Sequence, residues 1–224
     1  MKTFVLSLGG AIVVPEEIDT NFLKKFKKLI LKYSKNNKFY IIVGGGRTCR
    51  KYQAVLRGLG IKDSNDLDWT GVAATRLNAT LVRSLFGKSA LSEIITDPNM
   101  IPRGKSSIII GGGWKPGWST DYVAVSVAKK VKAEAVINLS NIDYIYSEDP
   151  QKQPKAKPLS QLSWPELRAL VGSEWVPGMN LPFDPIACKL AEKQGVKLIV
   201  ANGRNLSNLE KIILGKQFFG TEVS

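Results

Sequence analysis

The chain has 224 residues, of which 44% are hydrophobic, and 32 lysines and arginines against 19 acidic residues give it a net charge of +13. This length and apolar content suffice for a substantial core, and no apolar run approaches the roughly 18 residues needed to span a bilayer. The sequence contains no histidine, which excludes Ser-His-Asp and Cys-His hydrolases and histidine-bound metals.

The cysteine count and the N-terminus bear on the cellular compartment. Cys49 and Cys188 are too few for a disulfide framework or a zinc site. The N-terminus carries charge but has neither the long apolar region nor the cleavage site of a signal peptide. We therefore expect a cytoplasmic protein with two reduced thiols and no membrane partner.

The positive charge leaves three interpretations open: nucleic-acid binding, attraction of phosphorylated small molecules, or the habit of a lysine-rich proteome. The basic residues are dispersed along the chain. The densest run, 24–38, has apolar residues on one side at helical spacing, which makes its lysines a solvated face. This pattern argues against nucleic acid as the partner.

The first part of the chain alternates short apolar strands with amphipathic helices. A strand over Thr3–Leu8 runs into two glycines, and an amphipathic helix follows over Asp19–Asn36. A second strand, Lys38–Val43, ends in three glycines. Helices are then expected from Arg47 to about Leu59 and over 68–86.

The alternation continues to the end of the chain. A segment over 141–150 resembles a turn with a short hairpin, and 151–158 is a polar loop rich in proline. Ser163-Trp164-Pro165-Glu166 is a capping box, so a helix begins there. The remaining predicted strands are 90–96, 107–110, 135–139 and 196–200, and the remaining predicted helices are 120–132, 184–194 and 206–214. Strands alternating with helices favour a mainly parallel sheet covered on both faces, in a single domain over 1–224.

Three of the predicted strands end in glycines, at Leu8-Gly9-Gly10, Val43-Gly44-Gly45-Gly46 and Ile110-Gly111-Gly112-Gly113. Ligands bind at the carboxyl ends of strands in parallel α/β sheets. Glycines there allow the backbone to approach a ligand, and the helix N-termini that follow attract phosphate. Tight turns alone could explain one such junction, but three in one sheet favour a phosphate site. Neither G-x-x-x-x-G-K-[ST] nor G-x-G-x-x-G occurs, which weakens P-loop and Rossmann interpretations.

Four motifs carry a resemblance to a known family. They are Leu6-Ser7-Leu8-Gly9-Gly10-Ala11, Val43-Gly44-Gly45-Gly46-Arg47 with Arg50-Lys51-Tyr52, Gly112-Gly113-Trp114-Lys115-Pro116-Gly117-Trp118-Ser119-Thr120-Asp121, and Asn141-Ile142-Asp143-Tyr144-Ile145-Tyr146-Ser147-Glu148-Asp149-Pro150. The chain resembles the amino acid kinase superfamily over nearly its whole length, and within it the archaeal-type uridylate (UMP) kinases.

This resemblance implies an α/β three-layer αβα sandwich around a mainly parallel sheet of about eight strands. It also implies ATP with Mg²⁺ as phosphoryl donor and UMP as acceptor. The N-terminal half would bind the acceptor and the C-terminal half ATP. The protein would be a homo-oligomer, either a hexamer built as a trimer of dimers or a dimer.

The resemblance also assigns roles to individual residues. ATP would be bound by Ser7, Leu8, Gly9, Gly10, Ala11, Gly46, Arg50, Ser140, Tyr146 and Asp149. UMP would be bound by Gly45, Asp68, Trp114, Lys115, Pro116, Gly117, Trp118, Ser119 and Thr120. Simple helix capping remains an alternative for Asp68 and for Asp121, which could otherwise orient a phosphate-binding group or hold Mg²⁺ through water.

Two departures from the family pattern concern charge at the reacting phosphate. Many members place a lysine where this chain has Ser7, and some have a G-M-x-x-K lysine where this chain has Pro182. Phosphoryl transfer needs positive charge placed next to the equatorial oxygens of the moving group, so Arg47 and Lys115 become the candidate catalytic cations. Asp121 is the third candidate catalytic residue. We expect no metal site built from protein ligands alone.

Three functional alternatives to a UMP kinase stay open from the sequence. Trp114, Lys115 and Trp118 differ from the residues expected in the acceptor-reading segment, so a related kinase could act on another small acceptor. The missing lysines allow a non-catalytic nucleotide- or oxyanion-binding protein, for which ATP would bind without turnover. Nucleic-acid binding would show itself by a steep salt dependence.

Overall fold

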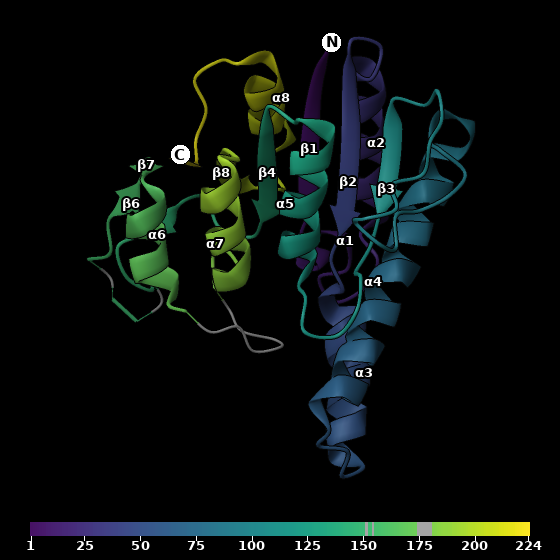
Figure 1. Ribbon diagram of the computed structural model, residues 1–224, viewed down its shortest axis with the longest axis vertical. Helices are drawn as coiled ribbons and strands as arrows, with labels where there is room; N and C mark the ends of the chain where they lie inside the picture. Colours follow the sequence, from purple (N-terminus) through teal and green to yellow (C-terminus); the bar gives the residue numbers. More distant parts are fainter. Residues whose placement is uncertain (151, 154, 174–180) are drawn as a thin grey trace.

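The computed structural model describes residues 1–150, 152–153, 155–173 and 181–224, and within them seven strands form one sheet (Figure 1). The strand order is β3-β2-β1-β4-β8-β9-β7. The first five strands in this order are mutually parallel, while β9 runs antiparallel to β8, and β7 pairs in parallel with β9. Their bounds are β1 Lys2–Leu8, β2 Asn37–Val43, β3 Ile108–Gly111, β4 Ala135–Ser140, β7 Gln161–Leu162, β8 Leu198–Asn202 and β9 Thr221–Val223.

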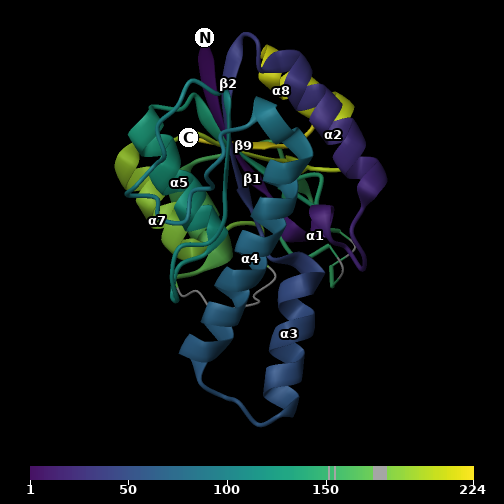
Figure 2. The same ribbon diagram turned by 90° about the vertical axis from the view of Figure 1, so that its right-hand side faces the viewer.

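Helices cover both faces of this sheet, as Figure 2 shows. One buried cluster joins the sheet to α2 (Thr20–Tyr33), α4 (Ser64–Phe86) and α8 (Leu206–Leu214). A second cluster joins the other face to α5 (Thr120–Val131), α6 (Trp164–Val171) and α7 (Pro185–Gln194). The predicted three-layer sandwich is therefore confirmed, with seven strands rather than about eight.

Side-chain alternation along β1 sets the two faces apart. Phe4, Leu6 and Leu8 belong to the cluster under α2, whereas Val5 belongs to the cluster under α5. Strand residues alternate between the faces of a sheet, so Ser7 faces the α5 layer. This places its hydroxyl next to the start of α5.

The helices α3 (Gly46–Gly58) and α4 pack against each other, and α3 projects with the first turns of α4 beyond the sheet (Figures 1 and 2). Asp63 caps α4, so this helix begins four residues before the predicted 68–86. In the part of the chain that the structure describes, no helix is long and apolar enough to cross a membrane.

Two predicted strand features differ in the structure. Segment 90–96 forms no strand but touches β3 at two isolated bridges, Ala90 with Ile108 and Ile95 with Gly111, because exposed Ser92 and Glu93 interrupt its apolar run. The hairpin expected within 141–150 is wrong, because β5 (Ile145–Tyr146) pairs with β6 (Pro158–Leu159) from beyond that segment.

Shorter elements add to the predicted set. A one-turn helix α1 (Gly10–Val13) follows β1, and a 3-10 turn η1 (Gly87–Ser89) follows α4. The capping box at Ser163 and Glu166 is confirmed, and α6 begins behind it. In the predicted loop 151–158, residues 151 and 154 lie outside the described part of the chain.

Candidate active site

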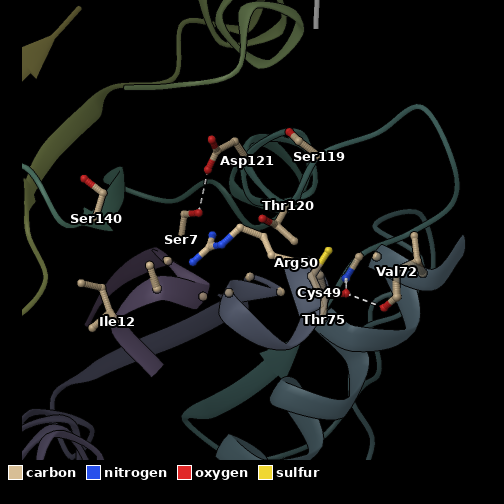
Figure 3. A pocket seen from close by; sticks show the side chains of 18 of the residues that line it. Ser7, Ile12, Cys49, Arg50, Val72, Thr75, Ser119, Thr120, Asp121 and Ser140 are labelled. Carbon is tan, nitrogen blue, oxygen red and sulfur yellow. Dashed lines mark hydrogen bonds between the residues drawn. The ribbon is translucent and has the colours of Figure 1, made fainter. Parts of the chain in front are cut away.

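A cavity of about 610 Å³ opens at the carboxyl ends of the parallel strands (Figure 3). All three glycine junctions contribute to its wall, as the sequence predicts for a ligand site in a parallel sheet. The predicted site residues that line it are Ser7, Gly9, Gly10, Ala11, Gly45, Gly46, Arg50, Asp68, Lys115, Trp118, Ser119, Thr120, Asp121 and Ser140.

The first two glycine loops touch each other backbone to backbone. A Cβ atom on Gly10 would lie 2.6 Å from the carbonyl carbon of Gly44 and 2.6 Å from Cα of Gly46, and closer still to the Gly46 nitrogen. Gly46 also has a φ of +59°, a left-handed conformation that favours glycine. Glycine is therefore required here for the approach of the two loops that form the cavity floor.

Two long helices begin at the cavity wall. α3 starts at Gly46 with no side-chain cap, and α5 starts behind Ser119, whose hydroxyl accepts a hydrogen bond from the amide of Tyr122. Unpaired amides and the helix dipole give such N-termini a partial positive charge. The cavity therefore suits an anionic ligand, and phosphate groups are the kind that such sites commonly bind.

A half-buried carboxylate, Asp121, lies in the first turn of α5. The Ser7 hydroxyl donates a hydrogen bond of 2.8 Å to Asp121, and the Asn138 amide lies 3.5 Å from the same oxygen. Burial raises the pKa of Asp121 to about 7; the Ser7 bond opposes this rise and the nearby Asp184 adds to it. Ser119 caps α5, so capping does not explain Asp121.

Asp184 forms the second half of this acidic pair. It caps α7 by accepting hydrogen bonds from the amides of Ile186 and Ala187, and the Ser119 hydroxyl donates a hydrogen bond to it. Burial raises the pKa of Asp184, and these hydrogen bonds oppose the rise. The hydroxyls of Ser7 and Ser119 thus orient the half-buried carboxylate of Asp121 and the buried one of Asp184 at the α5 side of the cavity.

Segment 112–119, which links β3 to α5 and is called the β3–α5 loop below, rests on α4. The amide of Gly113 donates to the Thr75 hydroxyl at 2.7 Å, and the amide of Gly117 donates to Asp68 at 2.8 Å. Farther along α4, the Asn78 side chain donates to the carbonyls of Gly44 and Gly45 at 2.9 and 3.0 Å. Asp68 lies inside α4 behind the Asp63 cap, so helix capping does not explain it either.

Aromatic rings gather on the β3–α5 loop and the first turn of α5. Trp118 packs on Tyr122 with ring centroids 4.1 Å apart and on Trp114 at 5.9 Å. The Lys115 ammonium lies 4.2 Å from the centre of the Trp114 ring, a cation–π contact. Lys115 and Trp118 line the cavity, so this cluster offers a cation and a ring face to a ligand.

The two arginines of α3 lie differently. Arg50 lines the cavity, and Figure 3 shows its guanidinium directed toward Ser7. Arg47, a predicted catalytic cation, instead places its Nε 3.0 Å from a carboxylate oxygen of Glu16. Among the described residues Arg47 is not part of the cavity lining.

Other predicted site residues are also absent from the described cavity lining. Leu8 is fully buried in the cluster under α2, so only its backbone is near the first glycine loop. The described lining likewise leaves out Trp114, Pro116, Gly117, Tyr146 and Asp149. In the G-M-x-x segment, residues 178–180 lie outside the described part of the chain, whereas Leu181 and Pro182 line the cavity.

Several lining residues carry no sequence motif of their own. Asn138 could have been found from the sequence, because it is a polar residue inside an apolar, buried strand. In the structure it pairs in register with Ser7. Cys49 is half-buried in the wall, and burial raises the pKa of its thiol. The remaining lining residues that the sequence did not single out are Ile12, Gln53, Gly71, Val72 and Thr75. Gly44 and Gly113 belong to the predicted glycine junctions and Asn141 to the fourth motif, and all three line the cavity.

Comparison with known proteins identifies the family. The model of the amino acid kinase family matches residues 2–202. Proteins named uridylate kinase from Methanospirillum hungatei and Thermoplasma volcanium are 35% and 34% identical to this chain, covering 100% and 99% of it and 95% and 97% of their own lengths. The crystal structure of uridylate kinase from Archaeoglobus fulgidus superposes with a TM-score of 0.86 at 33% identity over 100% of both chains. UMP kinase from Bacillus anthracis, 19% identical over 100% of this chain and 96% of its own, shares the fold with a TM-score of 0.78. The chain therefore belongs to the amino acid kinase family.

Proposed function

We propose that this protein is a phosphotransferase that moves the γ-phosphoryl group of ATP to UMP, giving ADP and UDP, a step of pyrimidine nucleotide synthesis. The observation that carries the proposal is the cavity in which three glycine junctions and two long-helix N-termini meet. Its relatives over the full chain are named uridylate kinases, which supports UMP as the acceptor.

We assign the donor to the side of the cavity formed by β1 and β4. The backbone of the first glycine loop, Ser7 to Ala11, would surround the ATP phosphates, with Gly46 and Arg50 beside them. Ser140 would contact the adenosine part, together with Tyr146 and Asp149 at its margin. The C-terminal half of the single domain 1–224 would thus bind most of ATP, and the N-terminal half the acceptor.

The acceptor would lie between Gly45, α4 and the β3–α5 loop. Asp68 has one oxygen on the Gly117 amide and retains a second oxygen that can accept from sugar hydroxyls. Lys115 and Trp118 would meet the acceptor from the loop, with Ser119 and Thr120 at the start of α5. The backbones of Trp114, Pro116 and Gly117 would shape this loop from behind.

Charge stabilisation falls to the side chains that face the cavity. Arg50 and Lys115 both line it, so we propose that they neutralise the charge spread over the transferred phosphoryl oxygens. Arg47 would act indirectly, because Glu16 pairs with its guanidinium. Asp121 would orient the Ser7 hydroxyl and the phosphates next to it.

Mg²⁺ bound with ATP is the proposed cofactor. Described residues contain no cluster of three or more metal-binding side chains, which fits an ion held mostly by phosphates and water with one carboxylate. Asp121 would be that carboxylate. When bound, the ion would neutralise charge on the β- and γ-phosphates.

We further propose a homo-oligomer in the cytoplasm, a hexamer or a dimer. The projecting α3–α4 pair exposes apolar side chains, among them Tyr52, Val55, Leu59 and Trp69, and such patches mark protein contacts. Cys49 and Cys188 are free thiols, as is usual in reducing compartments. Light scattering coupled to gel filtration measures the mass in solution, and a monomer would contradict the assembly.

Transfer of label tests the proposed reaction itself. ATP labelled in its γ-phosphoryl group is incubated with Mg²⁺, UMP and the protein, and the products are separated. We expect the label in UDP at a rate that depends on UMP concentration. Label found only in inorganic phosphate would refute transfer to UMP and indicate hydrolysis of ATP. ATP bound without turnover would also refute the transfer and would favour a nucleotide-binding protein.

A further inference from the structure

Arg76 joins α4 to two stretches of backbone near the carboxyl end of β3: the residues that follow β3 and the segment that runs beside it. Its Nε donates to the carbonyl of Gly113 at 3.1 Å, and one terminal nitrogen donates to the carbonyl of Trp114 at 2.6 Å. The same terminal nitrogen lies 3.3 Å from the carbonyl of Thr96, on the segment that runs beside β3. One planar guanidinium therefore fixes three carbonyls on two separate stretches of chain.

Where it leaves β3, the β3–α5 loop is held by α4 and by the carbonyl of Ile95, which accepts the Gly112 amide at 3.0 Å. Gly112 and Gly113 press directly on α4: a Cβ on Gly112 would lie 3.2 Å from the Arg76 backbone, and one on Gly113 would lie 2.8 Å from the Thr75 hydroxyl. Thr75 holds the Gly113 amide, and Arg76 holds the carbonyls of two successive peptides, Gly113–Trp114 and Trp114–Lys115. The peptide plane that carries Lys115 into the cavity is thus set by Arg76.

The charge of Arg76 is directed at carbonyls alone. No carboxylate pairs with it among the described residues. Arginine presents its donors in a rigid fork, which lysine cannot reproduce although it carries the same charge. Geometry and charge can therefore be separated by substitution.

We propose that Arg76 is a positioning residue for the acceptor: through Gly113 and Trp114 it holds Lys115 and Trp118 in the orientation that binds the nucleoside monophosphate. This inference rests on the proposed function. Arg76 lies outside the described cavity lining, so it acts through the loop. The first glycine loop is held instead by β1, β4 and Gly44, for example through the amide of Gly9 on the Leu139 carbonyl at 2.9 Å. ATP binding should therefore be independent of Arg76.

The test compares Arg76→Met, Arg76→Lys and a matched control, Arg83→Met. Arg83 lies two turns farther along the same face of α4 and holds one carbonyl, that of Leu91, at 3.3 Å, away from the cavity. Because small displacements of binding groups have large kinetic effects, we expect both Arg76 variants to raise the KM for UMP about 10-fold. The KM for ATP should stay within about 2-fold in both. Arg83→Met should leave both constants unchanged.

Three results would overturn the proposal. Restoration of the UMP KM by Arg76→Lys would show that charge suffices without the fork. Equal loss for ATP and UMP, or the same loss in Arg83→Met, would show a general effect on folding. Should Arg76→Met fail to fold, Arg76→Lys, which keeps the charge and most of the apolar stem, decides the question.

Hydrogen exchange without nucleotide separates this inference from the proposed function. We expect the amides of Gly113 and Gly117 to exchange faster in both Arg76 variants than in the parent protein and Arg83→Met. Unchanged exchange would refute the positioning role whatever reaction the protein catalyses. Faster exchange in a protein that does not phosphorylate UMP would refute the proposed function alone.

Discussion

Replacing Gly10 with alanine tests the contact on which the cavity floor depends. The added methyl group would overlap Gly44 and Gly46, and each of the three nearest atoms belongs to the backbone. Side chains can rotate away from such an overlap, but the backbone of two short loops, each fixed between a strand and a helix, cannot. The two glycine loops must therefore move apart.

The structure sets the magnitude of this effect. Overpacking typically costs about 1–3 kcal/mol of folding free energy. Because the nearest atoms here are all backbone, we expect a cost of about 3 kcal/mol. A loss of that size lowers the melting temperature of a chain of this length by about 6–12 °C. Separation of the loops by about 1 Å should lower turnover roughly 100-fold.

Gly58→Ala is the matched control for this substitution. Gly58 is the last residue of α3, and a Cβ there would meet nothing within 4 Å. Alanine is favoured over glycine in helices by about 0.5–1 kcal/mol, so this variant should be as stable as the parent or slightly more. Thermal melts and ADP release measured on both variants give the comparison. Parent-like melting and turnover in Gly10→Ala would refute the close approach of the loops.

Three further predictions concern charge and loop support. Burial raises the pKa of Asp121 to about 7 from 3.8, so the folded protein retains a proton that the unfolded chain releases; the free energy of unfolding should fall as pH rises from about 4 to 7. Urea melts of Asp121→Asn should lose this part of the slope, and an unchanged slope would contradict the burial of the carboxylate. Arg50→Gln should lower kcat/KM at least about 10-fold while Arg47→Gln changes it less than about 3-fold; the reverse order in steady-state kinetics would restore Arg47 as the catalytic cation. Asn78→Ala frees the buried carbonyls of Gly44 and Gly45 and should cost about 1–3 kcal/mol in urea melts, whereas Thr80→Ala on the exposed face of α4 should cost less than about 0.5 kcal/mol.

The fold was predictable wherever one long apolar run made one element. Strands that end in glycine and helices with a clear apolar face were predicted to within a few residues. β7 and β9 were not, because two and three residues are too few for a periodic pattern. Segment 90–96 was assigned as a strand from its apolar residues, but continuous pairing depends on contacts that sequence periodicity does not report.

The candidate site was predictable at its glycines and less so at its side chains. Glycine junctions reveal themselves because the chemistry of a tight approach permits no other residue. Arg47 and Arg50 are three residues apart, and only the structure reveals that Glu16, far away in sequence, pairs with Arg47. Likewise Thr75, Arg76 and Asn78 bind backbone groups of distant loops, and backbone partners leave no trace in a motif.

ADP release from ATP and Mg²⁺ in a coupled assay, with UMP, CMP, dUMP and AMP each offered as acceptor, tests the central claim most directly. We predict rapid turnover with UMP and much slower turnover with the other three. Turnover with a different acceptor would assign the cavity to another kinase of the same fold. No turnover with any acceptor, while ATP still binds, would contradict the account.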